Sequence, residues 1–273
     1  MEGSKTHLWD KNRGVIRSSK GGWVIGKGVF THGHSLMELV RRKSYFEVLI
    51  LNVTGRLPEP RLAKWLEATY CCMSFPDPRI WCNQIGALGG TCRTAPFSGI
   101  LAGIMASDSR MYGPGTEVPV HHFLMQAMAE RRSGLSIEEI VTKRARRPGS
   151  QPTVPGFGRP IATGDERVMA LEQVTQDLGF VRGEYLTLAY EIEEYLLTKY
   201  KESMNLASYL VAFLADQNWS LSEMRQLTTA IVMAGVTACY DDANKSPPES
   251  FLPLHCDDIE YKGAAPRPVP EKD

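Results

Sequence analysis

The sequence predicts a mostly α-helical fold, and two observations support that expectation. Serine is followed three residues later by glutamate at four places, which is the capping-box pattern that begins a helix. These pairs are Ser35 and Glu38, Ser44 and Glu47, Ser136 and Glu139, and Ser220 and Glu223. Apolar residues then recur at helical spacing, as in Phe46, Ile50 and Val53.

The expected elements can be followed along the chain. Apolar side chains roughly alternate over residues 22–30, so a single strand is credible there. Helices then follow Ser35 and Ser44, and Pro58 and Pro60 interrupt the pattern because proline cannot continue a helix. Further helices are expected over residues 61–73, 97–107, 184–200 and 205–215. Residues 97–107 are rich in glycine and alanine, which suits a closely packed, buried helix.

The bulk composition is that of an ordinary globular protein. The 273 residues can form one large domain or two unequal ones, and 43% of them are apolar. Thirty-one basic residues balance 31 acidic ones, which gives no electrostatic argument for nucleic acid or an anionic membrane as a partner. The N-terminus lacks the apolar run of a signal peptide, and no apolar stretch reaches the ~20 residues of a membrane span. We therefore expect a soluble, cytoplasmic protein.

The six cysteines and the histidines give no sign of a metal site. The cysteines form no CxxC pair, so we expect reduced thiols in a cytosolic protein. Cys92 and Cys239 lie in apolar surroundings and are expected in the core. His32 and His34 are close in sequence, but no third ligand is recognisable nearby. No metal is expected.

The most informative segment is residues 155–167. Its glycines and prolines fix a tight turn, after which Arg159 and Arg167 stand eight residues apart with Asp165 between them. The upstream segment 143–147 adds four basic residues. A rigid backbone with converging guanidiniums suits a ligand that carries phosphates or carboxylates. The plainer alternative is a solvated basic surface loop.

Six segments of the chain resemble, in the same order, motifs of a known protein family. They are residues 53–58, 98–115, 155–167, 204–207, 232–240 and 259–263. Residues 155–167 are similar to a "G-x-G-H-R" loop, Tyr112 and Gly113 to an "H-G" loop, and residues 204–207 to a "P-N-V-D" turn. Over nearly its whole length the sequence thus resembles the citrate synthase-like family, including its shorter citryl-CoA lyase branch.

The resemblance implies a two-domain helical fold and a class of reaction. It places the large domain at residues 1–111, completed by residues 210–273, and the small domain at residues 112–209. It also implies a homodimer. The family makes or breaks a carbon–carbon bond next to a CoA thioester, using a carboxylate base and two histidines, so CoA or an acyl-CoA is the expected substrate and no metal is expected.

The sequence departs from the family at the catalytic positions. Tyr112 and Arg159 stand where histidines are expected, Pro160 replaces an arginine, and Ala207 replaces the aspartate. Because alanine cannot abstract a proton, the ordinary citrate synthase mechanism should be absent.

Two alternatives remain open. One is a repurposed enzyme, for which the resemblance and the residues together suggest a set of roles. Tyr112, Arg159 and Asp165 are the catalytic candidates, Gly156, Phe157, Gly158, Arg146 and Arg147 would bind the cofactor, and Arg167 would bind a substrate carboxylate. Arg159 and Arg167 could jointly hold a di- or tricarboxylate. The other alternative is a non-catalytic paralogue that binds CoA or a carboxylate, as a pseudoenzyme or regulatory subunit.

A replacement base would separate the two alternatives. Besides Asp165, the candidates are Glu117, His121 and His122, which follow the Tyr112 loop closely. The plainer interpretation of each is a helix-cap or surface role. A carboxylate or histidine within about 4 Å of a pocket shared with Arg159 would favour catalysis.

Overall fold

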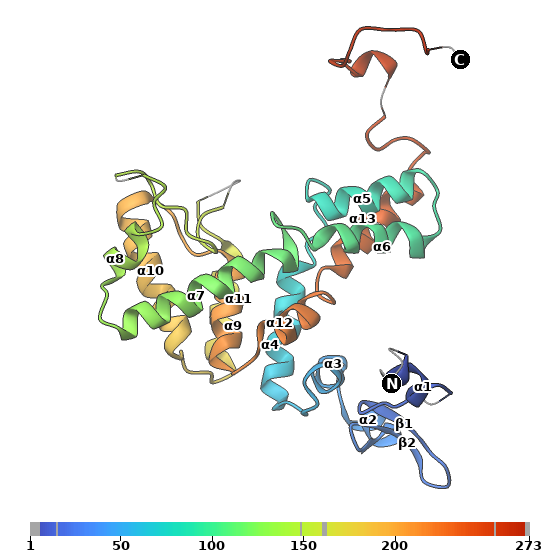
Figure 1. The fold of residues 1–273 in the computed structure, drawn as a ribbon, viewed down its shortest axis with the longest axis vertical. Coiled ribbons are helices and arrows are strands. Elements are labelled where there is room, and N and C mark those ends of the chain that lie inside the picture. The colour runs from blue at the N-terminus through green and yellow to red at the C-terminus, as the bar shows by residue number, and fades with distance from the viewer. Residues whose placement is uncertain (1–5, 15, 148, 160–162, 254, 271–273) are drawn as a thin grey trace, which may run out of the picture.

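The chain folds mostly into helices, as the sequence predicts (Figure 1). The structure is a computed structural model that describes residues 6–14, 16–147, 149–159, 163–253 and 255–270. The first elements are α1 (His7–Asn12), β1 (Gly21–Val24), β2 (Gly28–Thr31), β3 (His34–Ser35), α2 (Leu36–Arg42), α3 (Tyr45–Thr54), α4 (Pro60–Met73), α5 (Trp81–Thr91) and α6 (Pro96–Ser107). The rest are the 3-10 helix η1 (Gly113–Thr116), α7 (Glu117–Arg132), α8 (Ile137–Thr142), α9 (Glu166–Asp177), α10 (Glu184–Tyr200), α11 (Leu206–Asp216), α12 (Leu221–Thr228), α13 (Met233–Lys245) and the 3-10 helix η2 (Cys256–Asp258).

The expectation of a single strand over residues 22–30 is wrong, because the chain turns back within these residues and forms two strands. Strands β1 and β2 are antiparallel, and β3 extends the small sheet on the far side of β2. Gly26 and Gly28 both have positive φ, +76° and +121°, which lets the backbone turn between the two strands.

Three of the four expected capping boxes form. Ser44, Ser136 and Ser220 each cap their helix and exchange bonds with the glutamate three residues on. Ser35 also stands at the start of a helix, but its side chain makes no capping bond. Its backbone is paired with Phe30 as the last residue of β3, so strand pairing sets its conformation.

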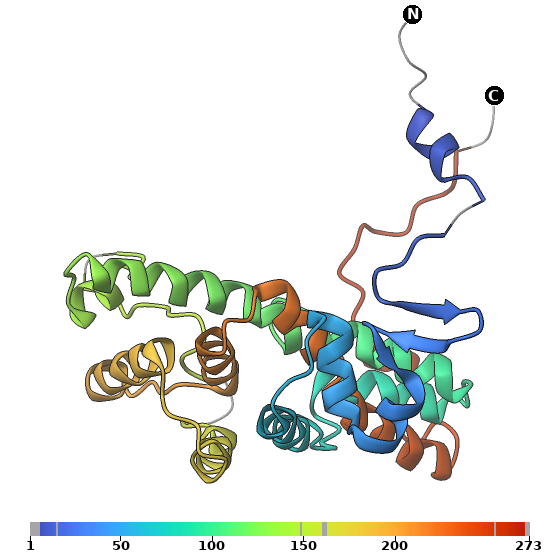
Figure 2. The same cartoon turned by 90° about the horizontal axis from the view of Figure 1, so that it is seen from below.

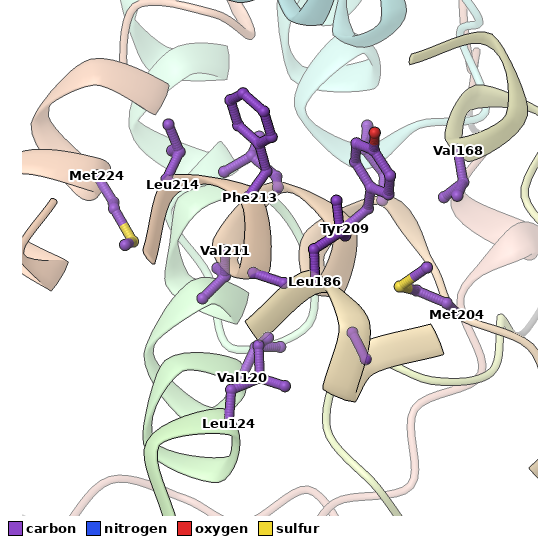
Figure 3. Packing of buried hydrophobic residues seen from close by; sticks show 14 of the residues in the cluster. Val120, Leu124, Val168, Leu186, Met204, Tyr209, Val211, Phe213, Leu214 and Met224 are labelled. Atoms are coloured by element: carbon purple, nitrogen blue, oxygen red, sulfur yellow. The ribbon is translucent and has the colours of Figure 1, made fainter. Parts of the chain in front are cut away.

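The main core surrounds α11. Residues from α3, α4 and α7 to α12 form one hydrophobic cluster, and most of α11 is buried within it. Figure 3 shows Tyr209 and Phe213 of α11 among side chains from α7, α9, α10 and α12. The ring of Trp65, from α4, stacks on that of Phe213, with 4.0 Å between the ring centroids. Helix α4 also packs against α9, so the core joins segments far apart in the sequence.

Helices α5, α6 and α13 form a separate layer, apart from the lobe of α7 to α11 (Figures 1 and 2). Glycines allow their close approach: a Cβ on Gly103 would lie 2.5 Å from Val236 Cγ1, and one on Gly90 would lie 2.3 Å from the Tyr240 carbonyl oxygen. The expectation of a buried helix over residues 97–107 is correct only for one face. Phe97 and Met105, on the other face of α6, are 78% and 77% exposed.

All six cysteines are free; Cys239 is buried as expected, but Cys92 is exposed because it lies just beyond the end of α5. Within the described ranges, no three metal-ligating side chains converge, and no helix is long and apolar enough to cross a membrane. The domain boundaries at residues 112 and 209 stay a prediction.

Candidate functional site

The glycine turn is bonded to the start of α11. Gly158 donates its backbone N–H to the Ser203 carbonyl at 2.8 Å, and Asn205 donates its own to the Gly156 carbonyl at 3.0 Å. The Asn205 side chain also donates to the Gly158 carbonyl at 3.0 Å, while its oxygen caps α11. Two segments about 45 residues apart in sequence are therefore held as one unit.

Both glycines of the turn need their small size or their backbone freedom. Gly156 and Gly158 have φ of +86° and +81°, in the left-handed region that other residues avoid. A Cβ on Gly156 would lie 2.7 Å from Ser208 Cβ and 3.1 Å from Val120 Cγ2. The turn thus lies directly against α7 and α11.

Asp165 is the buried centre of the arginine cluster. It caps α9, and its side chain is fully buried. Its carboxylate accepts hydrogen bonds from Arg167 Nε at 2.8 Å and Nη2 at 2.7 Å. One oxygen also accepts the Leu206 backbone N–H at 3.0 Å. Asp165 therefore joins the start of α9 to the start of α11.

Arg159 completes a network of four charges. Its Nη1 lies 2.7 Å from Glu166 Oε2 and 3.8 Å from Asp165 Oδ1. Glu166 is an exposed residue, whereas Arg159 and Arg167 are half-buried. The structure thus brings together Arg159, Asp165 and Arg167, which the sequence analysis singled out, and adds Glu166.

The ionisation of this network follows from its contacts. Burial raises the pKa of Asp165, but hydrogen bonds from Arg167 and Leu206 and the charge of Arg159 outweigh it, so the pKa lies below its ordinary value. Burial lowers the pKa of Arg167, but Asp165 raises it more. The pair is therefore ionised at neutral pH.

Tyr112 lies within electrostatic reach of the same cluster. Burial, followed by the neighbouring Cys82 thiol, raises the pKa of the Tyr112 hydroxyl to about 12, against the lowering effect of Arg167. The phenol is therefore neutral at physiological pH, with a hydroxyl that can donate a hydrogen bond. Tyr112 precedes η1 and so is positioned by the turn that begins α7.

The end of α4 forms another wall of the site, which sequence reasoning missed. Arg167 Nη1 lies 3.8 Å from Met73 Sδ. Burial raises the pKa of Cys72, and the charges of Arg167 and Asp165 act on the same thiol, the first lowering its pKa and the second raising it. Nothing in the local sequence pattern of these residues marks them, because only the packing of α4 against α9 brings them here.

Two adjoining cavities lie beside the glycine turn. The larger, of about 380 Å³, is lined by Gln151, Pro152, Thr153, Val154, Phe157, Gly158, Arg159, Leu196 and Glu202. The smaller, of about 280 Å³, is lined by Gly158, Arg159, Thr163, Gly164, Lys201, Glu202 and Ser203. Both reach Arg159, so this residue links the cavities to the charge network.

The basic segment before the turn divides into two pairs. Lys143 and Arg144 both bind Glu130, at 3.0 and 2.7 Å. Arg146 and Arg147 are exposed and form no ion pair with any residue in the described ranges. They lie in the segment that leads to Gln151, a residue of the larger cavity, but they line neither cavity themselves.

The candidate bases are placed as follows. Asp165 lies within 4 Å of Arg159, but it is buried and already accepts four hydrogen bonds, three from Arg167 and one from Leu206. Burial raises the pKa of Glu117 to about 8, and the groups that act on it are Thr228, Arg225 and Asp108, which lie outside the arginine cluster. His122 is exposed, and burial lowers the pKa of His121. Ala207 stands in the first turn of α11, and Pro160 lies outside the described residues.

Comparison with known proteins identifies the fold. No protein-family model and no curated protein matches the chain. Among solved structures, citryl-CoA lyase from Hydrogenobacter thermophilus is similar with a TM-score of 0.78 at 20% identity, covering 94% of this chain and 98% of that one. ATP citrate lyase from Methanothrix soehngenii, in complex with citrate and coenzyme A, gives 0.76 at 16% identity and covers 97% of this chain but 45% of that one.

A citrate synthase from Thermotoga maritima is also similar, with a TM-score of 0.62 at 18% identity over 83% of this chain and 60% of that one. The three similar proteins share a helical architecture with this chain, whose only described sheet is the small three-stranded one. The expected architecture is therefore confirmed: this chain has the citrate synthase-like fold.

Proposed function

We propose that the chain binds CoA or an acyl-CoA beside residues 154–159 and a carboxylate at Arg167. One observation carries the proposal: the glycine turn and Asp165 are both bonded to the start of α11, and Asp165 holds Arg167, so a cofactor site and a carboxylate site share one rigid support. Citryl-CoA lyase and an ATP citrate lyase complex with citrate and coenzyme A have the same fold. The proposed reaction makes or cleaves a carbon–carbon bond next to a CoA thioester of a carboxylic acid.

The cofactor would use the larger cavity and the free arginines. Val154 and Phe157 give the cavity apolar walls, and its volume of about 380 Å³ suits part of a nucleotide. Arg146 and Arg147 are exposed and bind no described carboxylate, so both can pair with phosphates. The positive φ of Gly156 and Gly158 shapes the turn that presents the backbone of Gly158 to both cavities.

The altered residues take different roles from those of the family. Tyr112, whose hydroxyl is neutral, would donate a hydrogen bond to the thioester oxygen as negative charge develops there. Arg159 would bind an anion rather than transfer protons. Asp165 was a catalytic candidate, but its lowered pKa and its four hydrogen bonds suit a residue that positions Arg167.

A second candidate function is a non-catalytic paralogue that binds CoA or a carboxylate. Two observations favour it: Ala207 offers no base, and the carboxylate of Asp165 is fully hydrogen-bonded. Losing one general base typically removes ~10²–10⁴ in rate. Product analysis separates the two functions, because only the enzyme converts an acyl-CoA at ordinary turnover rates.

We also propose that the chain is a cytoplasmic homodimer. The exposed apolar side chains Trp81, Phe97 and Met105 lie on the α5–α6–α13 layer, and a second copy would remove them from water. Six free thiols suit a reducing compartment. Light scattering at micromolar concentration tests the dimer, and Phe97→Glu should give a monomer.

The binding proposal is tested by titrating CoA and acetyl-CoA into the protein by calorimetry. Replacing both Arg146 and Arg147 by alanine should weaken CoA binding at least about tenfold, since hydrogen bonds between charged groups contribute ~1.5–3 kcal/mol each. The matched control is the double replacement of Arg41 and Arg42, two adjacent exposed arginines on α2. Equal affinities of the two double variants would contradict the cofactor assignment.

The chemistry is tested with acetyl-CoA and oxaloacetate. Little or no citrate is expected, because Ala207 replaces the family's base. Citrate formation at ordinary enzyme rates would show that a base acts in this site after all.

A further inference from the structure

The charges around the arginine pair cancel. Two guanidiniums, of Arg159 and Arg167, face two carboxylates, of Asp165 and Glu166. The adjoining cavities add one more cation, Lys201, and one more anion, Glu202. The site therefore has no excess positive charge for a ligand with several carboxylates.

Each guanidinium keeps one edge free. Arg167 uses Nε and one hydrogen of Nη2 for Asp165, so Nη1, next to Met73 Sδ, and the second hydrogen of Nη2 are left for a ligand. Arg159 uses Nη1 for Glu166, which leaves Nε and Nη2. One carboxylate can bind at these free positions. A second carboxylate would add a further negative charge beside Asp165 and Glu166, and it would gain a cation of its own only by displacing one of them.

Displacing Asp165 is unfavourable, because its side chain is fully buried and would lose its partner cation. Glu166 is the weaker obstacle, since its side chain is 75% exposed and exposed ion pairs contribute little. Glu166 is thus the residue that limits how much negative charge the site accepts.

The remaining walls near Arg167 are uncharged. Burial raises the pKa values of the Cys72 and Cys82 thiols, and that of Tyr112 to about 12. Met73 is apolar and polarisable. A second carboxylate placed against such a wall would lose its hydration without gaining a partner.

We propose that the carboxylate ligand of this site is a monocarboxylic acid with an uncharged body, not a di- or tricarboxylate. The inference rests on the proposed function, because it takes Arg167 as the carboxylate site. It also assigns Glu166 as the residue that sets this specificity. The joint binding of a di- or tricarboxylate by Arg159 and Arg167 is accordingly replaced by the binding of one carboxylate.

The test uses calorimetric titration of 2-oxobutyrate, oxaloacetate and citrate into the full chain, at constant ionic strength and with and without saturating CoA. We expect 2-oxobutyrate to bind at least about tenfold more tightly than oxaloacetate, because like charges brought together cost several kcal/mol. Glu166→Gln should reduce that ratio several-fold or reverse it. The control Glu67→Gln removes the same charge from an exposed position on α4 and should leave the ratio unchanged.

Each outcome decides the inference. Tighter binding of oxaloacetate or citrate by the unmodified protein overturns it, and so does the absence of binding by all three acids. A preference for 2-oxobutyrate that Glu166→Gln leaves unchanged overturns the charge argument. Failure of CoA to bind contradicts the cofactor part of the proposed function, while the ranking of the acids alone still tests the monocarboxylate site.

Discussion

The carboxylate of Asp165 binds the guanidinium of Arg167 through both oxygens: Oδ1 lies 2.8 Å from Nε and Oδ2 lies 2.7 Å from Nη2. It also accepts the N–H of Leu206 at the start of α11. This arrangement fixes the direction of Arg167 before any ligand arrives, because two parallel hydrogen bonds define the plane of the guanidinium. The geometry of the site therefore depends on a structural ion pair.

Replacing Asp165 with asparagine should destabilise the protein strongly. The change removes the negative charge but leaves Arg167 half-buried, and breaking a buried pair costs ~3–5 kcal/mol. We expect a loss of about 3 kcal/mol in the free energy of unfolding, measured by urea titration at pH 7. Glu166→Gln is the control: this glutamate is exposed, so its loss should cost less than ~1 kcal/mol. Equal losses for the two variants would contradict the structural role of Asp165.

The same pair predicts how stability changes in acid. The pKa of Asp165 is lower in the folded protein than in the unfolded chain, so its contribution is present above the unfolded value of ~3.9 and is lost as the pH falls through the folded pKa. Urea midpoints measured from pH 6 to pH 3 should fall more steeply for the unmodified protein than for Asp165→Asn. Parallel curves would mean that Asp165 has the same pKa in both states.

Alanine should be tolerated less at Gly156 than at Gly158. Both positions have positive φ, which costs ~1–2 kcal/mol for a residue with a Cβ. At Gly156 the added methyl would also meet Ser208 and Val120, and overpacking adds ~1–3 kcal/mol. At Gly158 it would meet only the end of the Glu202 side chain, which can move. We expect urea unfolding to show a loss of about 3 kcal/mol for Gly156→Ala and about 1 kcal/mol for Gly158→Ala.

The control for this comparison is Gly134→Ala. Gly134 has φ of +97° and no atom within 4 Å of an added Cβ, so it reports the backbone cost alone. A Gly156 variant no less stable than the Gly134 variant would show that the turn can move away from α7 and α11.

Local signals predicted the helices well, and contacts distant in sequence caused the errors. Ser44, Ser136 and Ser220 begin helices as expected, because a capping box acts within one turn. Ser35 makes no capping bond, since its backbone pairs with Phe30 across the sheet. Which face of α6 is buried depends on α5 and α13, and helical spacing alone does not reveal those neighbours.

In the candidate site, too, local signals predicted some residues, while contacts distant in sequence determined the others. Gly156, Gly158, Arg159 and Arg167 were found from the sequence because unusual residue types gather within a few positions. Met73 was missed, since the residues around it carry no such signal and only the packing of α4 against α9 brings it to Arg167. Whether Asp165 is a free base or a bonded one likewise depends on its distant partner Leu206.

Glu117 should make the protein less stable as the pH rises. It is 5% exposed at the start of α7, where its Oε2 bonds to no described residue, and burial raises its pKa to about 8 from its ordinary value of 4.5. Between these values the folded protein keeps a proton that the unfolded chain releases. Stability therefore falls by up to about 1.4 kcal/mol per pH unit from this group.

Glu117→Gln removes this effect, because glutamine cannot ionise. At pH 4.5 and below the variant and the unmodified protein should unfold at similar urea concentrations, and near pH 8 the variant should be more stable by roughly 2 kcal/mol or more. The exposed Glu67→Gln serves as control and should show no such divergence. A Glu117→Gln variant that is less stable than the unmodified protein at pH 8 would instead mean that the charged carboxylate pairs with Arg225 of α12, whose Nε is also buried without a described partner.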